Sequence, residues 1–229
     1  MATIAAMQRR LTEAGVTHTL DSGTLLGIIR DGRPIAGDND IDLAVVADGK
    51  TDAAAAVEEI AAVLRRDGYR VQLRSYRGLP YKIKATPTLR SAGDDRQASL
   101  YVDIIIYRKA GEYLWCPQWL DIPHGPHGRG AGWIVRRAIY ELLKRRKRAD
   151  TASRLWHAVS RNGTFWIPAG LLASMRSTEE GFQVPERTEE YLEFRYGEWR
   201  TPDPTWRIDR DGALQLAAPE QLGVRFDEP

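Results

Sequence analysis

Two aspartates in the N-terminal half, Asp40 and Asp42, have the type and spacing of metal-binding residues. They stand two residues apart in a segment, 38–46, that alternates polar and apolar residues as a β-strand does. Side chains two apart on a strand point to the same face, so we expect the two carboxylates to project together. Their charges repel one another unless a cation offsets them, as divalent ions do in phosphoryl-transfer sites. Taken alone, the pair is also compatible with the solvated face of an edge strand.

A third acid, Asp103, lies in the strongly apolar segment 101–106. Burying an unpaired carboxylate is costly, so Asp103 either reaches a cation or its strand exposes that face. If this strand neighbours the strand of Asp40 and Asp42, the three carboxylates converge, and Asp103 could accept the proton of an attacking hydroxyl group as general base. Carboxylate oxygens suit Mg²⁺, with Mn²⁺ as an alternative, and these segments offer no softer ligands.

A glycine turn that precedes the acids could bind phosphate. Gly23 and Thr24 open a segment of helical character, whose free backbone amides and positive dipole end can hold an anion, and Gly23 lets the backbone approach it closely. An ordinary helix cap by Ser22 or Thr24 is the alternative. Lys82, next to Tyr81 on an expected strand, is a further candidate to meet the phosphate of a donor.

The elements that must position these residues alternate between helix and strand. Apolar residues at helical spacing predict helices over 3–14, 24–30 and 52–66. Alternating and β-branched patterns predict strands over 17–22, 38–46, 69–76, 81–86, 100–107 and 113–116. The last two are expected to form a hairpin. This order of elements predicts a mixed α/β (α+β) fold for the N-terminal half.

The composition changes beyond the first 120 residues. A turn-rich stretch at 124–130 precedes a basic stretch at 136–148, for which a solvated helix face is the ordinary interpretation and docking of a phosphorylated donor or anionic surface the alternative. We therefore predict a catalytic core over 1–120, a helical and loop region over 121–213 that completes the substrate site, and a tail over 214–229.

Composition and charge limit the classes of function. The chain of 229 residues is 43% hydrophobic and has a formal net charge of +2, which is too balanced to require a nucleic acid partner. We therefore do not expect such a partner, although the charge does not exclude one. No apolar run approaches the roughly 20 residues that cross a bilayer, and no signal-peptide pattern opens the sequence, so we expect a cytoplasmic protein. The single cysteine, Cys116, agrees with a reducing compartment and excludes a cysteine-based zinc site.

Several sequence segments together form the pattern of a known family. The first two are GTLLGIIR at 23–30 and IAGDNDID at 35–42. The others are PYKI at 80–83, YVD at 101–103, VPER at 184–187 and YGEW at 196–199. These segments and their order, from about residue 15 to about residue 205, resemble the LicD family, which includes bacterial phosphocholine transferases and the fukutin-related ribitol-phosphate transferases.

This resemblance implies a nucleotidyltransferase-type core whose mixed sheet is flanked by helices. It also implies magnesium-dependent transfer of a phospho-alcohol from a CDP-activated donor to a sugar hydroxyl. The metal ligands of the family fall on Asp40 and Asp42, and its third acid falls on Asp103.

The phosphate-contacting loop and helix of the family fall on Gly23, Thr24 and Arg30. Many members have Pro-Trp-Asp-Asp-Asp where this chain has AGDND at 36–40, a departure that leaves the key acids but bears on the substrate pocket. A small-molecule acceptor is therefore an alternative to a glycan.

The predicted activity is that of a transferase of the EC 2.7 type, which moves phosphocholine or an alditol phosphate from a CDP-activated donor to a hydroxyl group. The same fold would also suit a nucleotidyltransferase that attaches NMP from an NTP to a small molecule, an RNA end or a protein. The alternative of another class is a catalytically silent module that binds an anionic partner through the basic stretch.

Overall fold

The computed structural model describes residues 2–47, 53–76, 79–88, 101–119, 162–206 and 214–215. Its helices are α1 (Ala2–Glu13), α2 (Ser22–Asp31), α3 (Ala53–Arg66), the 3-10 helix η1 (Ala169–Leu172) and α6 (Thr188–Tyr196). Its strands are β1 (His18–Leu20), β2 (Asp40–Ala47), β3 (Tyr69–Tyr76), β4 (Leu79–Pro87), β5 (Tyr101–Ala110), β6 (Tyr113–Trp119), β7 (Asn162–Pro168), β8 (Met175–Ser177), β9 (Gln183–Pro185) and β10 (Leu214–Gln215).

The strands that carry the predicted acids are neighbours in a mixed sheet. Strand β2 pairs antiparallel with β1 and parallel with β5. Strand β5 pairs antiparallel with β4 and with β6, and β4 also pairs with β3. A parallel pair needs a crossover between its strands, and here α3 and the β3–β4 hairpin provide it. The crossover thus brings β2 and β5 together although they are far apart in sequence.

Side chains alternate between the two faces of β2 and β5. Ile41, Leu43 and Ile104 are buried in the core, whereas Asp40 and Asp42, which alternate with them, are only half-buried. Each large aliphatic side chain buried in this way contributes about 1.5–3 kcal/mol to folding. The apolar positions therefore fix which face of the sheet receives the acids.

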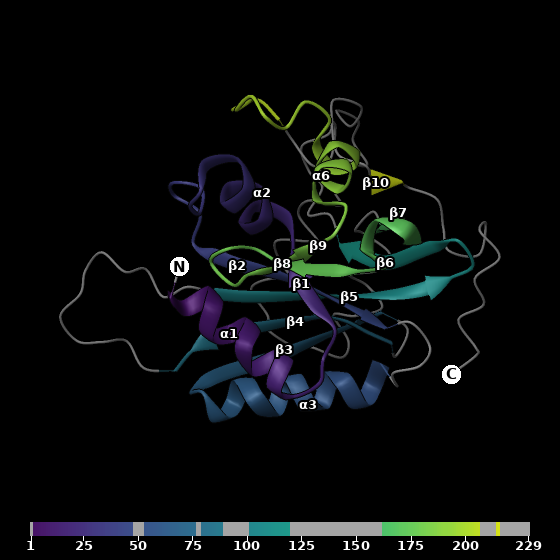
Figure 1. Ribbon diagram of the computed structural model, residues 1–229. Coiled ribbons are helices and arrows are strands. Elements are labelled where there is room, and N and C mark those ends of the chain that lie inside the picture. The colour runs from purple at the N-terminus through teal and green to yellow at the C-terminus, as the bar shows by residue number, and fades with distance from the viewer. Residues whose placement is uncertain are drawn as a thin grey trace, which may run out of the picture. The chain divides into compact units, whose positions relative to one another are not determined.

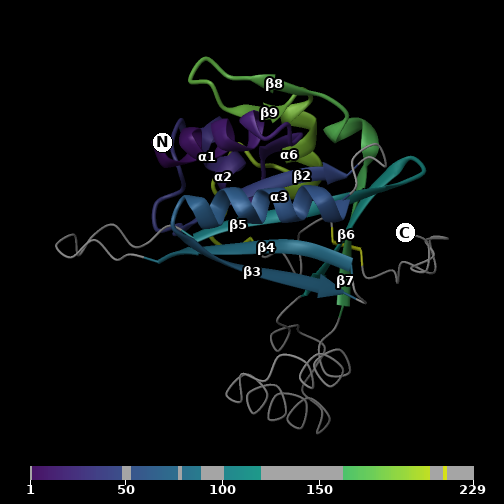
Figure 2. The same cartoon turned by 90° about the horizontal axis from the view of Figure 1, so that it is seen from below.

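Helices cover both sides of the sheet. Helix α3 packs against β3 and β4 through an apolar stripe that includes Val57, Ile60 and Leu64, and Gly68, with φ of 82°, ends the turn that follows it. Helix α2 packs against β2. Figure 1 shows α3 on one side of the sheet and α2 and α6 on the other. Seen from below in Figure 2, α3 lies in front of the strands.

The chain divides into two compact units. The first comprises Met1–Cys116 and Trp166–Asp203, and the second comprises Pro117–Phe165 and Pro204–Pro229. All the predicted site residues belong to the first unit. In the second, β10 pairs antiparallel with the Thr164–Phe165 part of β7. The division at residues 120 and 213 stays a prediction.

The predicted mixed α/β fold is confirmed, and the helices predicted over 3–14, 24–30 and 52–66 correspond to α1, α2 and α3. The C-terminal region differs in part, because the described residues 162–206 hold β7, β8 and β9 besides α6. Strands of three residues such as β8 and β9 are too short to show a periodic pattern. The basic stretch at 136–148 lies outside the described residues. Among the described helices, none is long and apolar enough to cross a membrane.

Candidate active site

Three carboxylates meet on one face of the sheet. Asp42 of β2 is in register with Asp103 of β5, and Asp40 lies two residues before Asp42 on the same face. One carboxylate oxygen of each residue lies within 4.8 Å of the other two. Ligand oxygens on opposite sides of one divalent ion are about 4–5 Å apart, so the three are spaced to share a cation. The convergence that the sequence predicted for neighbouring strands is therefore present.

Two lysines of β4 lie beside Asp103. Lys84 is the register partner of Asp103, and Lys82 lies two residues before it on the same face. The Lys82 Nζ atom is 2.6 Å from Asp103 Oδ2, and the Lys84 Nζ atom is 3.9 Å from Oδ1. Asp103 is 4% exposed, and its Oδ1 accepts no hydrogen bond. A buried carboxylate oxygen without a hydrogen-bond donor fits a cation ligand, since leaving it unmatched is costly.

Burial and mutual repulsion disfavour the charged form of the neighbouring acids. Burial, followed by the charges of Asp40 and Asp21, raises the pKa of Asp42 well above its ordinary value. Burial and a hydrogen bond with Asp40 raise the pKa of Asp38 to about 6. These shifts measure the cost of holding negative charge at this place, which a bound cation would offset.

Gly23 lies directly against the acids. A Cβ atom at Gly23 would be 2.8 Å from Asp38 Oδ2 and 3.9 Å from Asp42 Oδ2. The first distance is shorter than van der Waals contact, so a side chain would have to displace Asp38. The glycine therefore lets the start of α2 approach the carboxylates closely.

The turn that opens α2 is tied to the backbone of Asp42. The backbone N–H of Asp21 donates to the carbonyl of Asp42 over 3.0 Å, and the N–H of Asp42 donates to Thr24 Oγ1 over 2.9 Å. The Asp21 carboxylate accepts the N–H of Ser22 over 2.7 Å and caps the helix. The alternative of a cap by Ser22 or Thr24 is thus wrong, because Asp21 takes that role and Thr24 holds Asp42.

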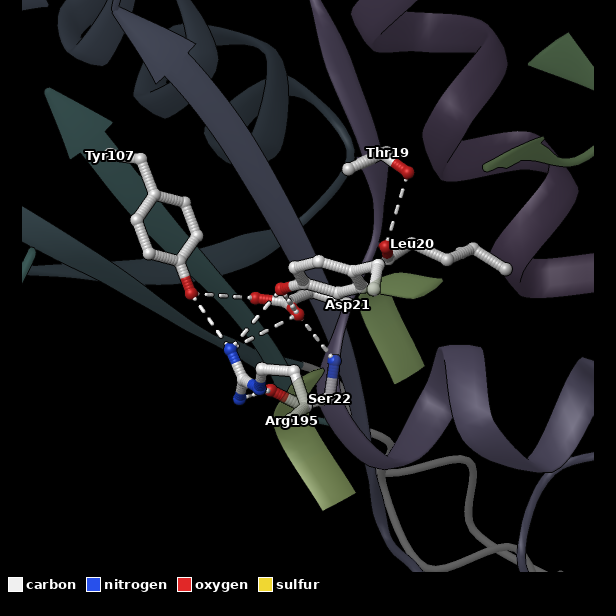
Figure 3. A network of polar contacts seen from close by, with 7 residues as sticks. Thr19, Leu20, Asp21, Ser22, Tyr107 and Arg195 are labelled. Carbon is white, nitrogen blue, oxygen red and sulfur yellow. Dashed lines mark hydrogen bonds and ion pairs between the residues drawn. The ribbon is translucent and has the colours of Figure 1, made fainter. Parts of the chain in front are cut away.

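A buried polar cluster stands behind this turn (Figure 3). The Tyr191 hydroxyl donates to Asp21 Oδ1 over 2.6 Å, and the Tyr107 hydroxyl donates to Oδ2 over 3.2 Å. Arg195 Nη1 lies 3.5 Å from Asp21 Oδ1 and donates to both tyrosine oxygens. Its Nη2 donates to Ser22 Oγ over 3.1 Å. The cluster joins β5 and α6 to the start of α2.

Two of the predicted phosphate-binding residues have other partners. Arg30 pairs with Asp31, whose Oδ2 is 2.8 Å from Arg30 Nη2, and this contact raises the pKa of Arg30. Lys82 pairs with Asp103 and so lies among the carboxylates. A role of either residue in binding phosphate stays a prediction.

The sequence did not point to four residues that the structure brings to this site. They are Asp21, Asp38, Lys84 and Arg195. Asp38 and Lys84 each stand two residues from a predicted site residue on an expected strand, and that spacing was the available signal. The sequence held no such signal for Asp21 and Arg195, because their contact joins residues far apart along the chain.

The sequence of this region matches a known family. Residues 15–128 match the family described as LicD/FKTN/FKRP, nucleotidyltransferase domain. Residues 15–128 of the chain therefore form a nucleotidyltransferase domain of the LicD family.

A comparison with solved structures found similarity to Cid1 poly(U) polymerase, in a crystal structure with MgGTP bound, at 17% identity and a TM-score of 0.35. The similar part covers 46% of this chain and 30% of the polymerase chain. Among curated proteins, none matches this sequence.

Proposed function

We propose that this protein is a magnesium-dependent transferase that moves a phospho-alcohol group, phosphocholine or an alditol phosphate, from a CDP-activated donor to a hydroxyl acceptor. The observation that carries the proposal is the convergence of Asp40, Asp42 and Asp103 within 4.8 Å. The acceptor class is a sugar or another small molecule with a free hydroxyl. Mn²⁺ would serve the same ligands as Mg²⁺.

Asp40 and Asp42 would hold the cation, and Asp103 would complete its ligand set. The bound cation would offset the charge of the donor phosphates. The first backbone amides of α2 would hold a phosphate oxygen, which Gly23 allows to come close to the acids. These contacts would orient the donor for in-line attack.

Asp103 would also orient the acceptor. Its carboxylate would accept the hydroxyl proton while the acceptor oxygen forms a bond to phosphorus and the bond to the CMP leaving group breaks. The ammonium groups of Lys82 and Lys84 lie beside this carboxylate, and each could in addition meet a donor phosphate.

Transfer of NMP from an NTP is the second candidate, because the matched family domain is described as a nucleotidyltransferase domain. The mass of the product separates the two reactions. A transferred nucleotide adds a base to the acceptor, whereas a transferred phospho-alcohol does not.

Thermal unfolding with nucleotides tests the proposal. The panel is CDP, CTP, ATP, GTP and UTP, each with and without Mg²⁺, on wild type, Asp42→Asn and Asp67→Asn. Asp67 pairs with Arg10 away from the acids, so Asp67→Asn is a matched control for the loss of one carboxylate.

We expect a magnesium-dependent rise in Tm with cytidine nucleotides in wild type and Asp67→Asn, and no rise in Asp42→Asn. Preference for another nucleotide would favour NMP transfer. No rise with any nucleotide would contradict both reactions and favour a catalytically silent binding module.

A further inference from the structure

The buried cluster of Asp21, Tyr107, Tyr191 and Arg195 lies next to the turn that opens α2. It has no part in the proposed reaction. Asp21 and Tyr107 are 0% exposed, Tyr191 is 1% exposed and Arg195 is 5% exposed. Such a cluster is costly to assemble unless every charge and hydroxyl has a partner. Here Arg195 offsets the charge of Asp21, and both phenols donate to the Asp21 carboxylate.

One contact of the cluster reaches the turn that opens α2. Arg195 Nη2 donates to Ser22 Oγ, and Ser22 is a non-glycine residue with φ of 48°. That backbone conformation is unfavourable for an L-residue, and it persists only where surrounding contacts impose it. The N–H of Ser22 is held by Asp21, and its hydroxyl is held by Arg195. The cluster therefore imposes the conformation of the residue that precedes Gly23.

The same turn fixes the backbone of Asp42. Asp21 donates its N–H to the carbonyl of Asp42, and Thr24 accepts the N–H of Asp42. Asp21 and Thr24, which flank Ser22 and Gly23, thus bind the carbonyl and the N–H of Asp42. A shift of the turn would move Asp42 relative to Asp103 on the neighbouring strand.

We propose that Arg195 is a positioning residue of the active site, which holds the Asp21–Thr24 turn and through it places Asp42 and the first amides of α2 for a magnesium-bound diphosphate. This inference rests on the proposed function, because it assigns Arg195 to the same metal and phosphate site. Arg195 acts from α6, outside the matched domain of residues 15–128.

The planar guanidinium group explains the choice of arginine. Its Nη1 serves the two phenols and Asp21, while its Nη2 serves Ser22. A lysine keeps the positive charge beside Asp21 but lacks the rigid fork that reaches all of these groups at once. Replacing Arg195 by lysine therefore separates the positioning of the turn from the neutralisation of Asp21.

The test is calorimetric titration with inorganic pyrophosphate in excess Mg²⁺, which probes the metal and phosphate site without turnover. The variants are Arg195→Lys, Ser22→Ala, Asp42→Asn and Arg200→Lys, each compared with wild type and each melted to record Tm. Ser22→Ala removes the acceptor of Nη2 while leaving the buried charge pair intact. Arg200→Lys is the matched control, since Arg200 pairs with Glu189 at an exposed position after α6.

We expect Arg195→Lys and Ser22→Ala to bind pyrophosphate about tenfold or more weakly than wild type, with Arg200→Lys unchanged. Asp42→Asn should not bind. If Arg195→Lys fails to fold, Ser22→Ala decides the matter alone.

Wild-type affinity in both folded variants, with binding lost in Asp42→Asn, would overturn the role of Arg195 and leave the proposed function standing. A lower Tm without weaker binding would mean a merely structural role and overturn it equally. Weaker binding in Ser22→Ala but not in Arg195→Lys would assign the effect to the Ser22 hydroxyl alone and would also overturn the role of Arg195. If wild type does not bind magnesium pyrophosphate, the proposed function and this inference both fail.

Discussion

Asp42 and Asp103 stand opposite each other as register partners on the parallel strands β2 and β5. Register partners on neighbouring strands point to the same face, so the two carboxylates are held together by the backbone of the sheet. Strand β4 then adds Lys82 and Lys84 on that face. The proposed metal site is thus built on three adjacent strands, which hold its groups more rigidly than a loop would.

Asp42→Asn should raise stability when divalent ions are removed. The pKa of Asp42 is raised in the folded state, so the folded protein binds this proton more tightly than the unfolded chain. The stabilisation by this proton is complete below the unfolded-state pKa and is lost as the pH rises through the folded-state pKa. In EDTA, the variant should therefore gain Tm over wild type as the pH rises above the unfolded-state pKa of about 4, and the gain should level off once Asp42 of the folded wild type is ionised.

Thermal melts of both proteins across this range measure the difference. Asp67→Asn is the control and should show no such gain. Parallel Tm profiles of wild type and Asp42→Asn against pH would contradict a raised pKa of Asp42 in the folded state.

Gly23→Ala should fold but lose most turnover. The new Cβ would meet Asp38 Oδ2 at 2.8 Å, and the carboxylate end of a side chain can move aside where backbone could not. The movement would disturb the acids, and we expect a fall of about tenfold or more in kcat. Steady-state kinetics with the donor found by the nucleotide panel gives the value.

Gly111→Ala is the matched control for the glycine change. Gly111 has φ of 58° and open space around its Cβ position, so the alanine should cost stability, about 1 kcal/mol, through backbone strain alone. Its kcat should equal that of wild type. Equal kcat in Gly23→Ala would contradict the close approach of donor and turn.

Lys82→Met should tighten cation binding and weaken donor binding. The Lys82 ammonium is 2.6 Å from Asp103 Oδ2, so its removal takes a positive charge away from the cation ligands. Lys84, at 3.9 Å from Oδ1, should give a smaller effect in Lys84→Met. Titration with Mn²⁺ gives the cation affinity, and KM for the donor gives the second effect. Unchanged Mn²⁺ affinity in both variants would argue against a cation at Asp103.

Asp21→Asn should destabilise the fold by about 3–5 kcal/mol, because it leaves the buried guanidinium of Arg195 without its counter-charge. Arg195→Met should cost a similar amount for the converse reason. The double variant removes both charges, so its loss should be smaller than the sum of the two single losses. Urea unfolding near neutral pH gives the three free energies. Additive losses would mean that the two charges do not interact.

The local sequence pattern was enough to predict most of the strands and helices that position the site residues. The two-residue spacing of Asp40 and Asp42 predicted their common face, and the apolar run around Asp103 predicted a buried strand. The helices α1, α2 and α3 followed from apolar periodicity. The strands β8 and β9 were missed, since three residues hold too little pattern to separate strand from loop.

The sequence by itself determined most strands and helices of the N-terminal half and the residue types able to hold a cation, because these depend on neighbours a few positions away. Only the tertiary structure decided that β2 lies parallel to β5, that Lys82 meets Asp103, and that Arg195 holds Ser22. Those contacts join segments far apart along the chain, and no local periodicity encodes which of them pair. They form because packing of the apolar core brings the strands and α6 together, and buried charges must then find partners among the groups that lie within reach.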